Sequence, residues 1–278
     1  MTIMEAALER AKKLREQQLG TAAAAPPVRA RRSSDSAPVA KPIQLNFPRL
    51  DPDPQVVRES RILIAPEFQH SAVSDAYRIL RTRLMHRVDS HGWKSFAITS
   101  AGAREGKSVT VLNLGLSIAS ERRRNVFLLD LDLRNPSLCR YLGVRPRVGI
   151  GQYLLGEAPV EDIFYSIGVE NLTLAGGLSS CENSAELLGG ERFGLLLDHV
   201  TKADPSALII ADLPPLLSVA DALVVAPKLS ATLLVVAEGI TRRNALARAL
   251  DLLGNVTLAG IALNHSSAAV GQYHRYHI

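Results

Sequence analysis

One short stretch limits what this chain can fold into more than any other feature. The sequence Thr99-Ser100-Ala101-Gly102-Ala103-Arg104-Glu105-Gly106-Lys107-Ser108 follows an apolar run of strand length and precedes apolar residues at helical spacing. Such a stretch can bind phosphate, because backbone amides converge at a helix N-terminus, a lysine reaches the β and γ phosphates and a hydroxyl can hold Mg²⁺. The strict pattern has glycine at the position of Ala101, which is a mild change. We therefore predict a phosphate-binding loop with its contacts at Ala101, Gly102, Ala103, Arg104, Glu105, Gly106, Lys107, Ser108 and Val109.

The remaining pattern predicts the fold around this loop. From Ser60 onward, apolar runs of strand length alternate with segments of helical period, which is typical of an α/β fold whose mostly parallel sheet is covered by helices on both faces. A P-loop NTPase fold follows from this order together with the loop. The predicted strands are 95–99, 125–130, 172–175, 207–212, 231–237 and 260–264, and the predicted helices are 71–88, 107–122, 184–201 and 242–253.

Composition divides the chain into four parts. Residues 1–20 place apolar side chains on one helical face and predict an amphipathic N-terminal helix. Residues 21–55 are rich in Ala, Pro, Ser and Arg, and seven of the 15 prolines fall before residue 55, which predicts a flexible linker. The helix is either a tethered docking element or folds back on the domain. Residues 56–270 form the predicted P-loop domain, and 271–278 form a tail that carries Tyr273 and Tyr276.

Charge and cysteine content limit which cellular compartment and which classes of partner we expect. The 32 basic and 27 acidic residues give +5, but the basic clusters lack the interleaved aromatic residues that stack exposed bases, so a nucleic-acid partner is not predicted. Two cysteines without metal or redox spacing favour a reducing compartment, and the cytoplasm is the expectation. Apolar runs are too short to cross a bilayer, so we expect membrane contact to be indirect.

Two further predicted strands end in carboxylates. Asp130 closes one apolar run, Asp132 points to the same side because side chains alternate, and Asp212 closes another run before two prolines. A single such aspartate is usually a turn or N-cap residue. Together with the phosphate loop, the three predict a site that positions Mg²⁺ and water, since strand ends in open α/β sheets face the ligand crevice.

These motifs resemble those of the cytoplasmic bacterial tyrosine autokinases (BY-kinases) of exopolysaccharide and capsule loci, relatives of the ParA and MinD type ATPases. The resemblance covers residues 60–278 and includes the Walker A loop, a Walker A′ motif Asp130-x-Asp132-x-Arg134, a Walker B motif Asp212-x-Pro214-Pro215 and the tyrosine tail. Residues 1–15 also resemble the subgroup of exosortase-linked loci.

The resemblance implies roles for particular residues. Lys107 contacts the phosphates of ATP, Ser108 and Asp212 hold Mg²⁺, and Asp130 and Asp132 organise metal, water and the incoming tyrosine hydroxyl, with Asp130 also a metal ligand and the favoured base. The implied catalytic residues are thus Lys107, Asp130 and Asp132, and the implied metal ligands are Ser108, Asp130 and Asp212. Asn264 matches the position that touches adenine in relatives, although an asparagine at a strand end is often a turn residue. Tyr273 and Tyr276 are the expected phosphoacceptors.

The resemblance also implies partners. Asp75, Arg78 and Arg81 stand where relatives carry an ExxRxxR motif that packs subunits into a ring, and their spacing places them on one helix face. A homo-oligomer is therefore expected, with one subunit's tail entering the next subunit's site. In relatives a transmembrane polysaccharide chain-length regulator activates the kinase, so recruitment to the inner face of the membrane by such a partner is expected.

Two departures from the family pattern leave alternatives open. Arg104 replaces the usual glycine, and it is either strained, if that position takes a positive φ, or available for a further phosphate contact. Leu213 stands where relatives often have threonine, so a hydroxyl is lost. The alternative functions are a ParA or MinD type regulatory ATPase without tyrosine kinase activity, whose signature lysine is missing here, and a nucleotide-binding regulatory subunit.

Overall fold

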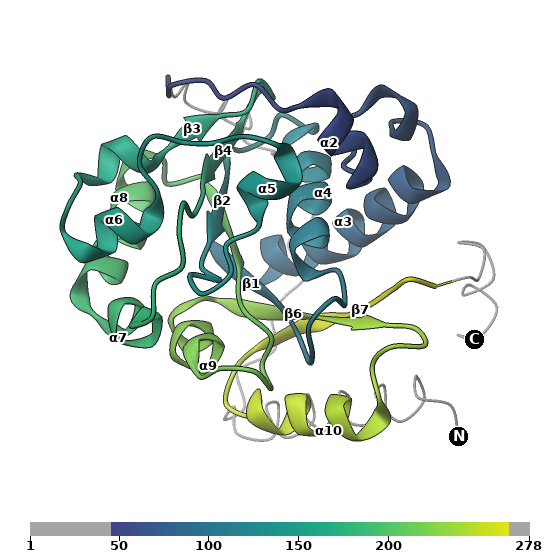
Figure 1. Ribbon diagram of the computed structural model, residues 1–278. Coiled ribbons are helices and arrows are strands. Elements are labelled where there is room, and N and C mark those ends of the chain that lie inside the picture. Colours follow the sequence, from purple (N-terminus) through teal and green to yellow (C-terminus); the bar gives the residue numbers. More distant parts are fainter. Residues whose placement is uncertain (1–45, 267–278) are drawn as a thin grey trace, which may run out of the picture.

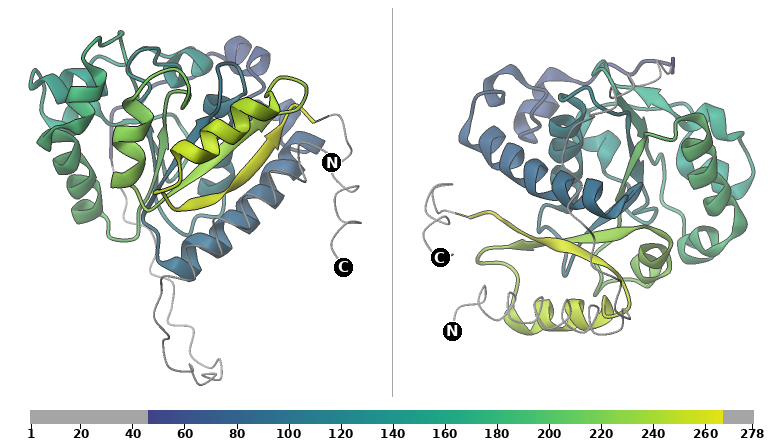
Figure 2. Two further views of the ribbon diagram at one scale, coloured as in Figure 1. Left: turned by 90° about the horizontal axis from the view of Figure 1, so that it is seen from below. Right: turned by 180° about the vertical axis from the view of Figure 1, so that it is seen from behind.

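A computed structural model describes residues 46–266 and shows one seven-stranded sheet with helices on both faces (Figure 1, Figure 2). The strand order is β3-β4-β2-β5-β1-β6-β7, and neighbouring strands are parallel except β3, which pairs antiparallel with β4. This confirms the predicted α/β class with a mostly parallel sheet. The strands are β1 (Ser95–Ser100), β2 (Val126–Asp130), β3 (Tyr165–Ser166), β4 (Leu172–Ala175), β5 (Leu208–Asp212), β6 (Ala231–Ala237) and β7 (Leu258–Asn264).

Alternate residues of the strands supply two separate hydrophobic cores, one on each face of the sheet. In β2, for example, Val126 and Leu128 face one core while Phe127 and Leu129 face the other. The first core is covered by α2 (Pro54–Glu59), α3 (Ala72–His91), α4 (Lys107–Ala119) and α5 (Leu138–Leu142). The second is covered by α6 (Ile150–Leu155), α7 (Ser184–Gly189), α8 (Glu191–Ala203), α9 (Asp221–Val225) and α10 (Arg243–Leu252). Burial on both faces explains why the strands are continuous apolar runs.

The sheet brings the ends of three central strands to one edge. β1, β5 and β2 are adjacent and parallel, so the loops that follow them all leave at the carboxyl edge. α4 packs closely on this part of the sheet, because a Cβ atom on its Gly115 would stand 2.7 Å from a methyl carbon of Leu128. In Figure 1 the loop between β1 and α4 reaches the strands β6 and β7, and Asn264 at the end of β7 contacts it. This edge therefore positions the predicted phosphate loop and the predicted carboxylates together.

Most predicted elements are present, with differences where the local pattern is weak. The segment predicted as one helix over 184–201 is two helices, α7 and α8, because Gly190 takes an extended conformation between them. β3 is a two-residue strand, too short to leave a pattern in the sequence. The short 3-10 helices η1 (Pro66–Phe68), η2 (Val160–Ile163) and η3 (Ala226–Lys228) and the helices α2, α5, α6 and α9 were not predicted.

The packed part of the chain begins earlier than the predicted boundary at residue 56. Phe47 contacts the aromatic rings of Phe127 and Phe164, Leu50 N–H donates to the Ser166 carbonyl, and the Asp53 carboxylate caps α2. Within the predicted linker, residues 46–55 thus belong to the folded domain. The predicted N-terminal helix and the tyrosine tail lie outside the described residues. In the part of the chain that is described, no helix is long and apolar enough to cross a membrane.

Candidate nucleotide site

The loop between β1 and α4 is clamped at three points. Glu105 is buried, and its carboxylate accepts a hydrogen bond from the Ala101 N–H at 3.0 Å, which folds the loop back on its own start. The Asn264 side-chain amide donates to the Glu105 carbonyl at 3.0 Å. Gly106 has φ 88°, and a Cβ there would stand 2.0 Å from the amide nitrogen of Asn264. The loop conformation is therefore determined by its neighbours, and α4 begins directly after it at Lys107.

Arg104 takes a left-handed backbone conformation in this loop, with φ 63° and an exposed side chain. The first of the two alternatives considered for Arg104 is thus observed, because a residue with a Cβ pays about 1 to 2 kcal/mol in this region. The flanking contacts of Glu105 and Gly106 impose the conformation. Local strain of this kind is tolerated where surrounding structure over-determines it, often at binding sites.

Lys107 is held between Asp132, in the loop after β2, and Asp212, the last residue of β5. Its Nζ atom lies 2.8 Å from Asp132 Oδ2, 3.2 Å from Asp212 Oδ1 and 3.1 Å from Ser108 Oγ. Burial alone would lower the pKa of Lys107, but the negative charges of Asp212 and Asp132 outweigh it and raise the pKa. The ammonium is therefore charged, and it contacts Asp132 and Asp212, which would compete with a phosphate for it.

Asp130 and Asp212 form the base of the site. They lie opposite each other in the register of β2 and β5, and both are fully buried. Asp130 Oδ2 accepts hydrogen bonds from the Ser137 and Leu138 N–H groups at 2.8 and 2.9 Å. Burial, and then the charge of Asp212, raise the pKa of Asp130 to about 7, while burial raises the pKa of Asp212 against the opposing effect of Lys107. The pair therefore binds a cation or a proton more readily than an ordinary aspartate.

The donor set of this site fits a hard divalent cation. Asp130 Oδ1 and Asp212 Oδ2 are buried and have no hydrogen-bond partner among the described residues, and the Ser108 hydroxyl lies beside the same Lys107 ammonium. Among those residues no group of three His, Cys, Asp or Glu side chains is placed to hold a metal by itself. Mg²⁺ commonly takes one or two carboxylates and completes its shell with phosphate and water. Ser108, Asp130 and Asp212 would supply the protein ligands.

The site contains one residue that the sequence did not single out. The Ser137 hydroxyl donates to Ser108 Oγ at 2.8 Å and its backbone N–H donates to Asp130, so this residue joins the start of α4 to the end of β2. Its position just before α5 was the available signal. Leu213 is buried in the second core and brings no hydroxyl to the site, as expected from its side chain. Thr99 instead donates its hydroxyl to the Pro214 carbonyl at 2.7 Å, which fixes the loop after β5.

The residues predicted for subunit contacts are not equivalent. Asp75 and Arg78 form an exposed ion pair at 3.0 Å on α3. Arg81 instead turns inward: its side chain is 17% exposed, donates to the Ser117 carbonyl at 2.8 Å and lies 2.9 Å from Glu121 Oε1. Asp75 and Arg78 therefore remain available to a neighbour, whereas Arg81 is already used within the chain.

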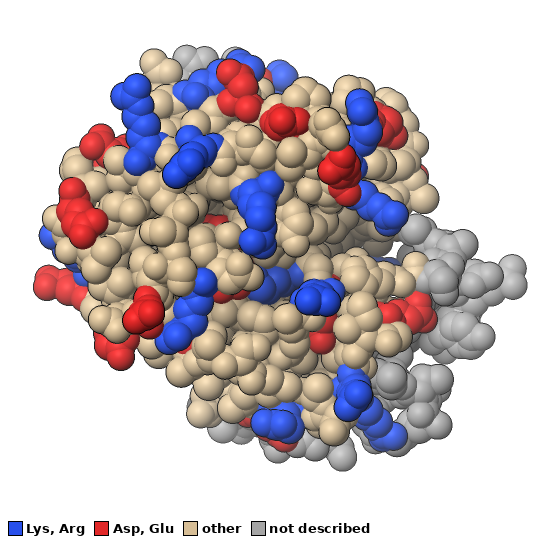
Figure 3. Space-filling model, in the orientation of Figure 1, with Lys and Arg blue, Asp and Glu red and all other residues tan. Residues whose placement is uncertain are grey.

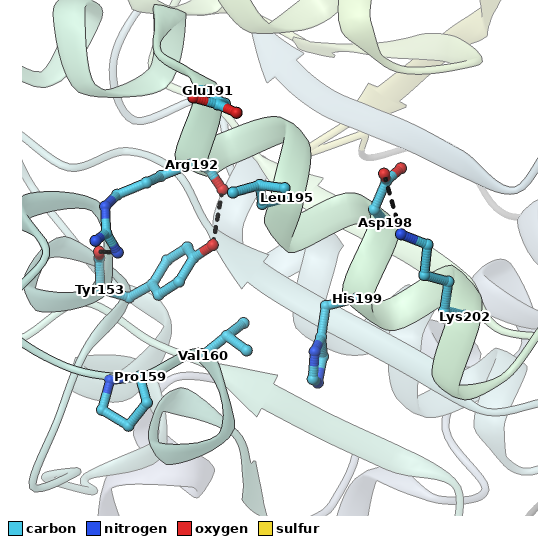
Figure 4. Close-up of a pocket in the computed structure, with 9 residues that line it drawn as sticks. All are labelled: Tyr153, Pro159, Val160, Glu191, Arg192, Leu195, Asp198, His199 and Lys202. Atoms are coloured by element: carbon cyan, nitrogen blue, oxygen red, sulfur yellow. Dashed lines mark hydrogen bonds and ion pairs between the residues drawn. The ribbon is translucent and has the colours of Figure 1, made fainter.

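Among the hollows of the described surface, one lies at the carboxyl edge and another beside α8. Figure 3 shows Lys and Arg side chains around a depression in the middle of the face that carries the carboxyl edge. A second hollow of about 590 Å³ lies between α8 and the α6–η2 segment, where Tyr153 and Val160 face His199 across it (Figure 4). The Tyr153 hydroxyl donates to the Arg192 carbonyl there at 2.9 Å. This second hollow contains none of the carboxylates of the candidate site and is an open groove beside α8.

Comparison with known proteins gives a consistent set of relatives. The tyrosine-protein kinase YwqD of Bacillus subtilis is 31% identical over 196 residues, which cover 70% of this chain and 81% of that protein. The tyrosine-protein kinase CpsD of Streptococcus agalactiae is 30% identical over 208 residues, which cover 74% of this chain and 88% of that protein. Two longer relatives are matched over only 24% and 23% of their length. No family model matches the chain.

Solved structures agree with these relatives. The kinase domain of the Escherichia coli tyrosine kinase ETK superposes with a TM-score of 0.64 at 27% identity, covering 70% of this chain and 78% of that one. The cell division ATPase MinD of Pyrococcus furiosus superposes with a TM-score of 0.51 at 24% identity, covering 61% of this chain and 70% of that one. The second likeness shows a shared fold and is weaker than the first.

Proposed function

The chain belongs to the family of bacterial tyrosine-protein kinases, and we propose that it is an ATP- and Mg²⁺-dependent autokinase that phosphorylates its own C-terminal tail in trans. The observation that carries this proposal is the opposed pair Asp130 and Asp212 beside Lys107 and Ser108 of the phosphate loop, each with a buried oxygen that lacks a partner within residues 46–266. Membership of the family makes a nucleotide the expected ligand of this loop, and the donor set supports Mg²⁺ with it.

We assign a separate role in phosphoryl transfer to each residue of the site. Bound Mg²⁺ and ATP would supply the phosphoryl group and neutralise its charge. Lys107 leaves Asp132 and binds phosphate oxygens, while the loop amides from Gly102 onward hold the remaining phosphate charge. Freed from Lys107, the Asp132 carboxylate orients water or the acceptor. Asp130 accepts the proton of the tyrosine hydroxyl, since a phenol with a pKa near 10 needs a nearby acceptor.

Two elements of the proposal depend on the family resemblance. One is the acceptor tail with Tyr273 and Tyr276, and the other is a role in exopolysaccharide or capsule synthesis or export, at the inner face of the membrane and with a transmembrane chain-length regulator as activator. The first test of that partnership is deletion of residues 1–20. If association with the regulator is unchanged, the docking role of this segment is excluded.

Autophosphorylation is tested with purified protein, ATP and Mg²⁺, followed by phosphopeptide mapping. The wild type should be labelled at residues 271–278, and Lys107→Ala and the double variant Tyr273→Phe with Tyr276→Phe should not. Mixing Lys107→Ala, which keeps its tail, with the double variant, which keeps its site, should place label on the Lys107→Ala tail if transfer occurs in trans. Absence of label on the wild type, with or without the regulator, would favour a regulatory ATPase of the ParA or MinD type.

A further inference from the structure

A buried carboxylate outside the proposed reaction centre has an incomplete set of partners. Asp221, at the start of α9, is fully buried, and its Oδ2 accepts a hydrogen bond from the hydroxyl of Ser184, the first residue of α7. Its Oδ1 has no partner in the described part of the chain. A buried charge of this kind is costly unless a cation compensates it. The compensating cation is Arg134, whose Nε lies 3.4 Å from Asp221 Oδ2.

Arg134 is held by one corner of its guanidinium group. Its side chain is 43% exposed, and only Nε reaches Asp221, so both amino groups are without a protein partner among the described residues. An arginine that is fixed through Nε and has two unused amino groups can bind two oxygens of a phosphate at once. This geometry is that of a preorganised anion-binding site. A purely structural ion pair would also use the amino groups of the arginine.

The placement of Arg134 links this anion-binding site to the reaction centre. Arg134 follows Asp132 by two residues in the loop after β2, and Asp132 contacts Lys107. Two hydrogen bonds fix that loop. The Ser137 N–H donates to Asp130, and the Cys181 N–H donates to the Leu133 carbonyl at 2.8 Å. Arg134 is therefore presented from a rigid loop and not from a freely moving one.

The charge balance of the centre explains why another cation is useful there. Asp132 and Asp212 already contact the single ammonium of Lys107 and Asp130 lies beside them, so the protein side offers no surplus positive charge to an approaching phosphoryl group. Within the segment 131–137, Leu-Asp-Leu-Arg-Asn-Pro-Ser, Arg134 is the only basic residue. Mg²⁺ would neutralise the buried side of the group, and a guanidinium at the loop would neutralise the outer side.

We propose that Arg134, oriented by the buried Asp221, binds the oxygens of the phosphoryl group that is transferred. This inference rests on the proposed kinase function. The same group exists as the γ-phosphate of ATP before transfer and as the phosphate of a phosphotyrosine after it, and the chemistry of the anion-binding site suits both. Arg134 is thus assigned as a further substrate-binding residue, and Asp221 as its positioning residue.

The test measures equilibrium binding by calorimetry on the full chain. One arm compares a non-hydrolysable ATP analogue with ADP, both with Mg²⁺, and the other compares the peptide Gly-Gln-Tyr-His-Arg-Tyr-His-Ile with its phosphotyrosine form. The variants are Arg134→Ala, Arg134→Lys, Asp221→Asn and the double variant Arg134→Ala with Asp221→Asn. Arg140→Ala is the matched control, because Arg140 is exposed on α5 and contacts the same loop through Asn135 at 3.4 Å.

Arg134→Ala should weaken binding of the phosphate-bearing ligand about tenfold in one arm or both while leaving ADP or the plain peptide within twofold. The affected arm identifies the source of the phosphate. Arg134→Lys should lower the affinity for this ligand about threefold, since lysine keeps the charge but cannot bind two oxygens at once as the planar guanidinium does. Asp221→Asn should weaken binding of the same ligand, and the double variant should bind it no more weakly than Arg134→Ala does.

The inference is overturned if Arg134→Ala matches Arg140→Ala in both arms, or weakens binding of all ligands equally. A wild type that binds neither the nucleotides nor the phosphopeptide would overturn the kinase proposal as well, whereas one that binds them unchanged by Arg134→Ala overturns this inference alone.

Discussion

Asp130 and Asp212 face each other across neighbouring parallel strands, and each keeps one buried oxygen without a partner in the described residues. Two carboxylates this close cannot both be charged without a compensating cation. In this structure Lys107 compensates Asp212 directly, and the N–H groups of Ser137 and Leu138 compensate Asp130. The relationship makes the site sensitive to both pH and cations, and the first two predictions follow from it.

The stability of the nucleotide-free protein should fall as the pH rises from about 4 to about 7. The pKa of Asp130 is raised from 3.8 to about 7, so the folded state holds a proton over this range that the unfolded state has lost. Its contribution to stability is therefore full below about pH 4 and lost as the pH passes through about 7. Thermal melting of wild type and Asp130→Asn in metal-free buffer at pH 5 and pH 8 checks this. Asp130→Asn should remove most of the difference, and equal pH dependence of the two proteins would contradict it.

Lys107→Met should destabilise the nucleotide-free protein at pH 8 and much less at pH 5. The variant leaves Asp132 and Asp212 without their cation, and protonation of Asp212, whose pKa burial raises, relieves the resulting repulsion at lower pH. Loss of the phosphate contact should also weaken ATP binding about 100-fold. Lys202→Met is the matched control, since the one ion pair of Lys202 with a described residue is the exposed contact to Asp198 at 3.6 Å. Calorimetry and melting curves of both variants supply the measurements, and a similar change in the two would exclude this role of Lys107.

The contact between Asn264 and Gly106 should couple the last strand to the phosphate loop. Gly106→Ala should lower the free energy of unfolding by about 2 to 4 kcal/mol, because the new Cβ meets the Asn264 amide and the backbone keeps a positive φ. Asn264→Ala alone should cost about 1 kcal/mol through its lost hydrogen bond. The double variant should be more stable than Gly106→Ala. Denaturant unfolding of the four proteins measures the coupling, and additive effects would argue against the contact.

The sequence predicted the chemistry of the site better than its geometry. Lys107, Ser108, Asp130, Asp132 and Asp212 were identified because strand, loop and helix patterns place such residues at one edge of a parallel sheet. Contacts between segments far apart in the chain leave no local pattern in the sequence and could not be predicted from it. The bonds from Ser137 to Ser108 and from Ser184 to Asp221, like the early packing of Phe47, depend on tertiary structure alone.

The same limit applies to conformation. The glycine pattern of the family raised the question of φ at Arg104, but only the clamped loop answers it. Likewise, the break between α7 and α8 depends on the extended backbone of Gly190, which a helical spacing of apolar residues does not reveal. Element type was therefore predictable from periodicity, and element ends required the structure.

Arg104→Gly should stabilise the nucleotide-free protein by about 0.5 to 1 kcal/mol. Glycine removes the cost of a Cβ at φ 63°, and part of this gain is offset by the greater freedom of glycine in the unfolded chain. Arg122→Gly is the control at φ 54°, away from the phosphate loop, and should give a similar gain, because the ion pair with Glu170 that it also removes is exposed and contributes little. Denaturant unfolding of both variants tests this. A loss of stability in Arg104→Gly alone would mean that the arginine side chain makes a stabilising contact.

Arg78 and Arg81 should respond differently to substitution, although the sequence places both in one predicted subunit-contact motif. Arg81→Ala removes contacts to Ser117 and Glu121 from a mostly buried side chain, so the melting temperature should fall by several degrees, at roughly 2 to 4 °C per kcal/mol. Arg78→Ala removes an exposed ion pair with Asp75 and an exposed hydrogen bond to the Gln69 carbonyl at 3.3 Å, and it should leave the melting temperature within about 1 °C.

The proposed ring is therefore best tested through Arg78. If Arg78 and Asp75 contact a neighbouring subunit, Arg78→Ala should eliminate the large species of the unphosphorylated protein in size-exclusion chromatography with light scattering, at unchanged melting temperature. Arg83→Ala, an exposed arginine on the same helix, is the matched control and should leave the large species in place. Loss of the large species only in Arg81→Ala would instead attribute assembly to the fold of α3 against α4, and an unchanged mass in Arg78→Ala would exclude this face as the interface.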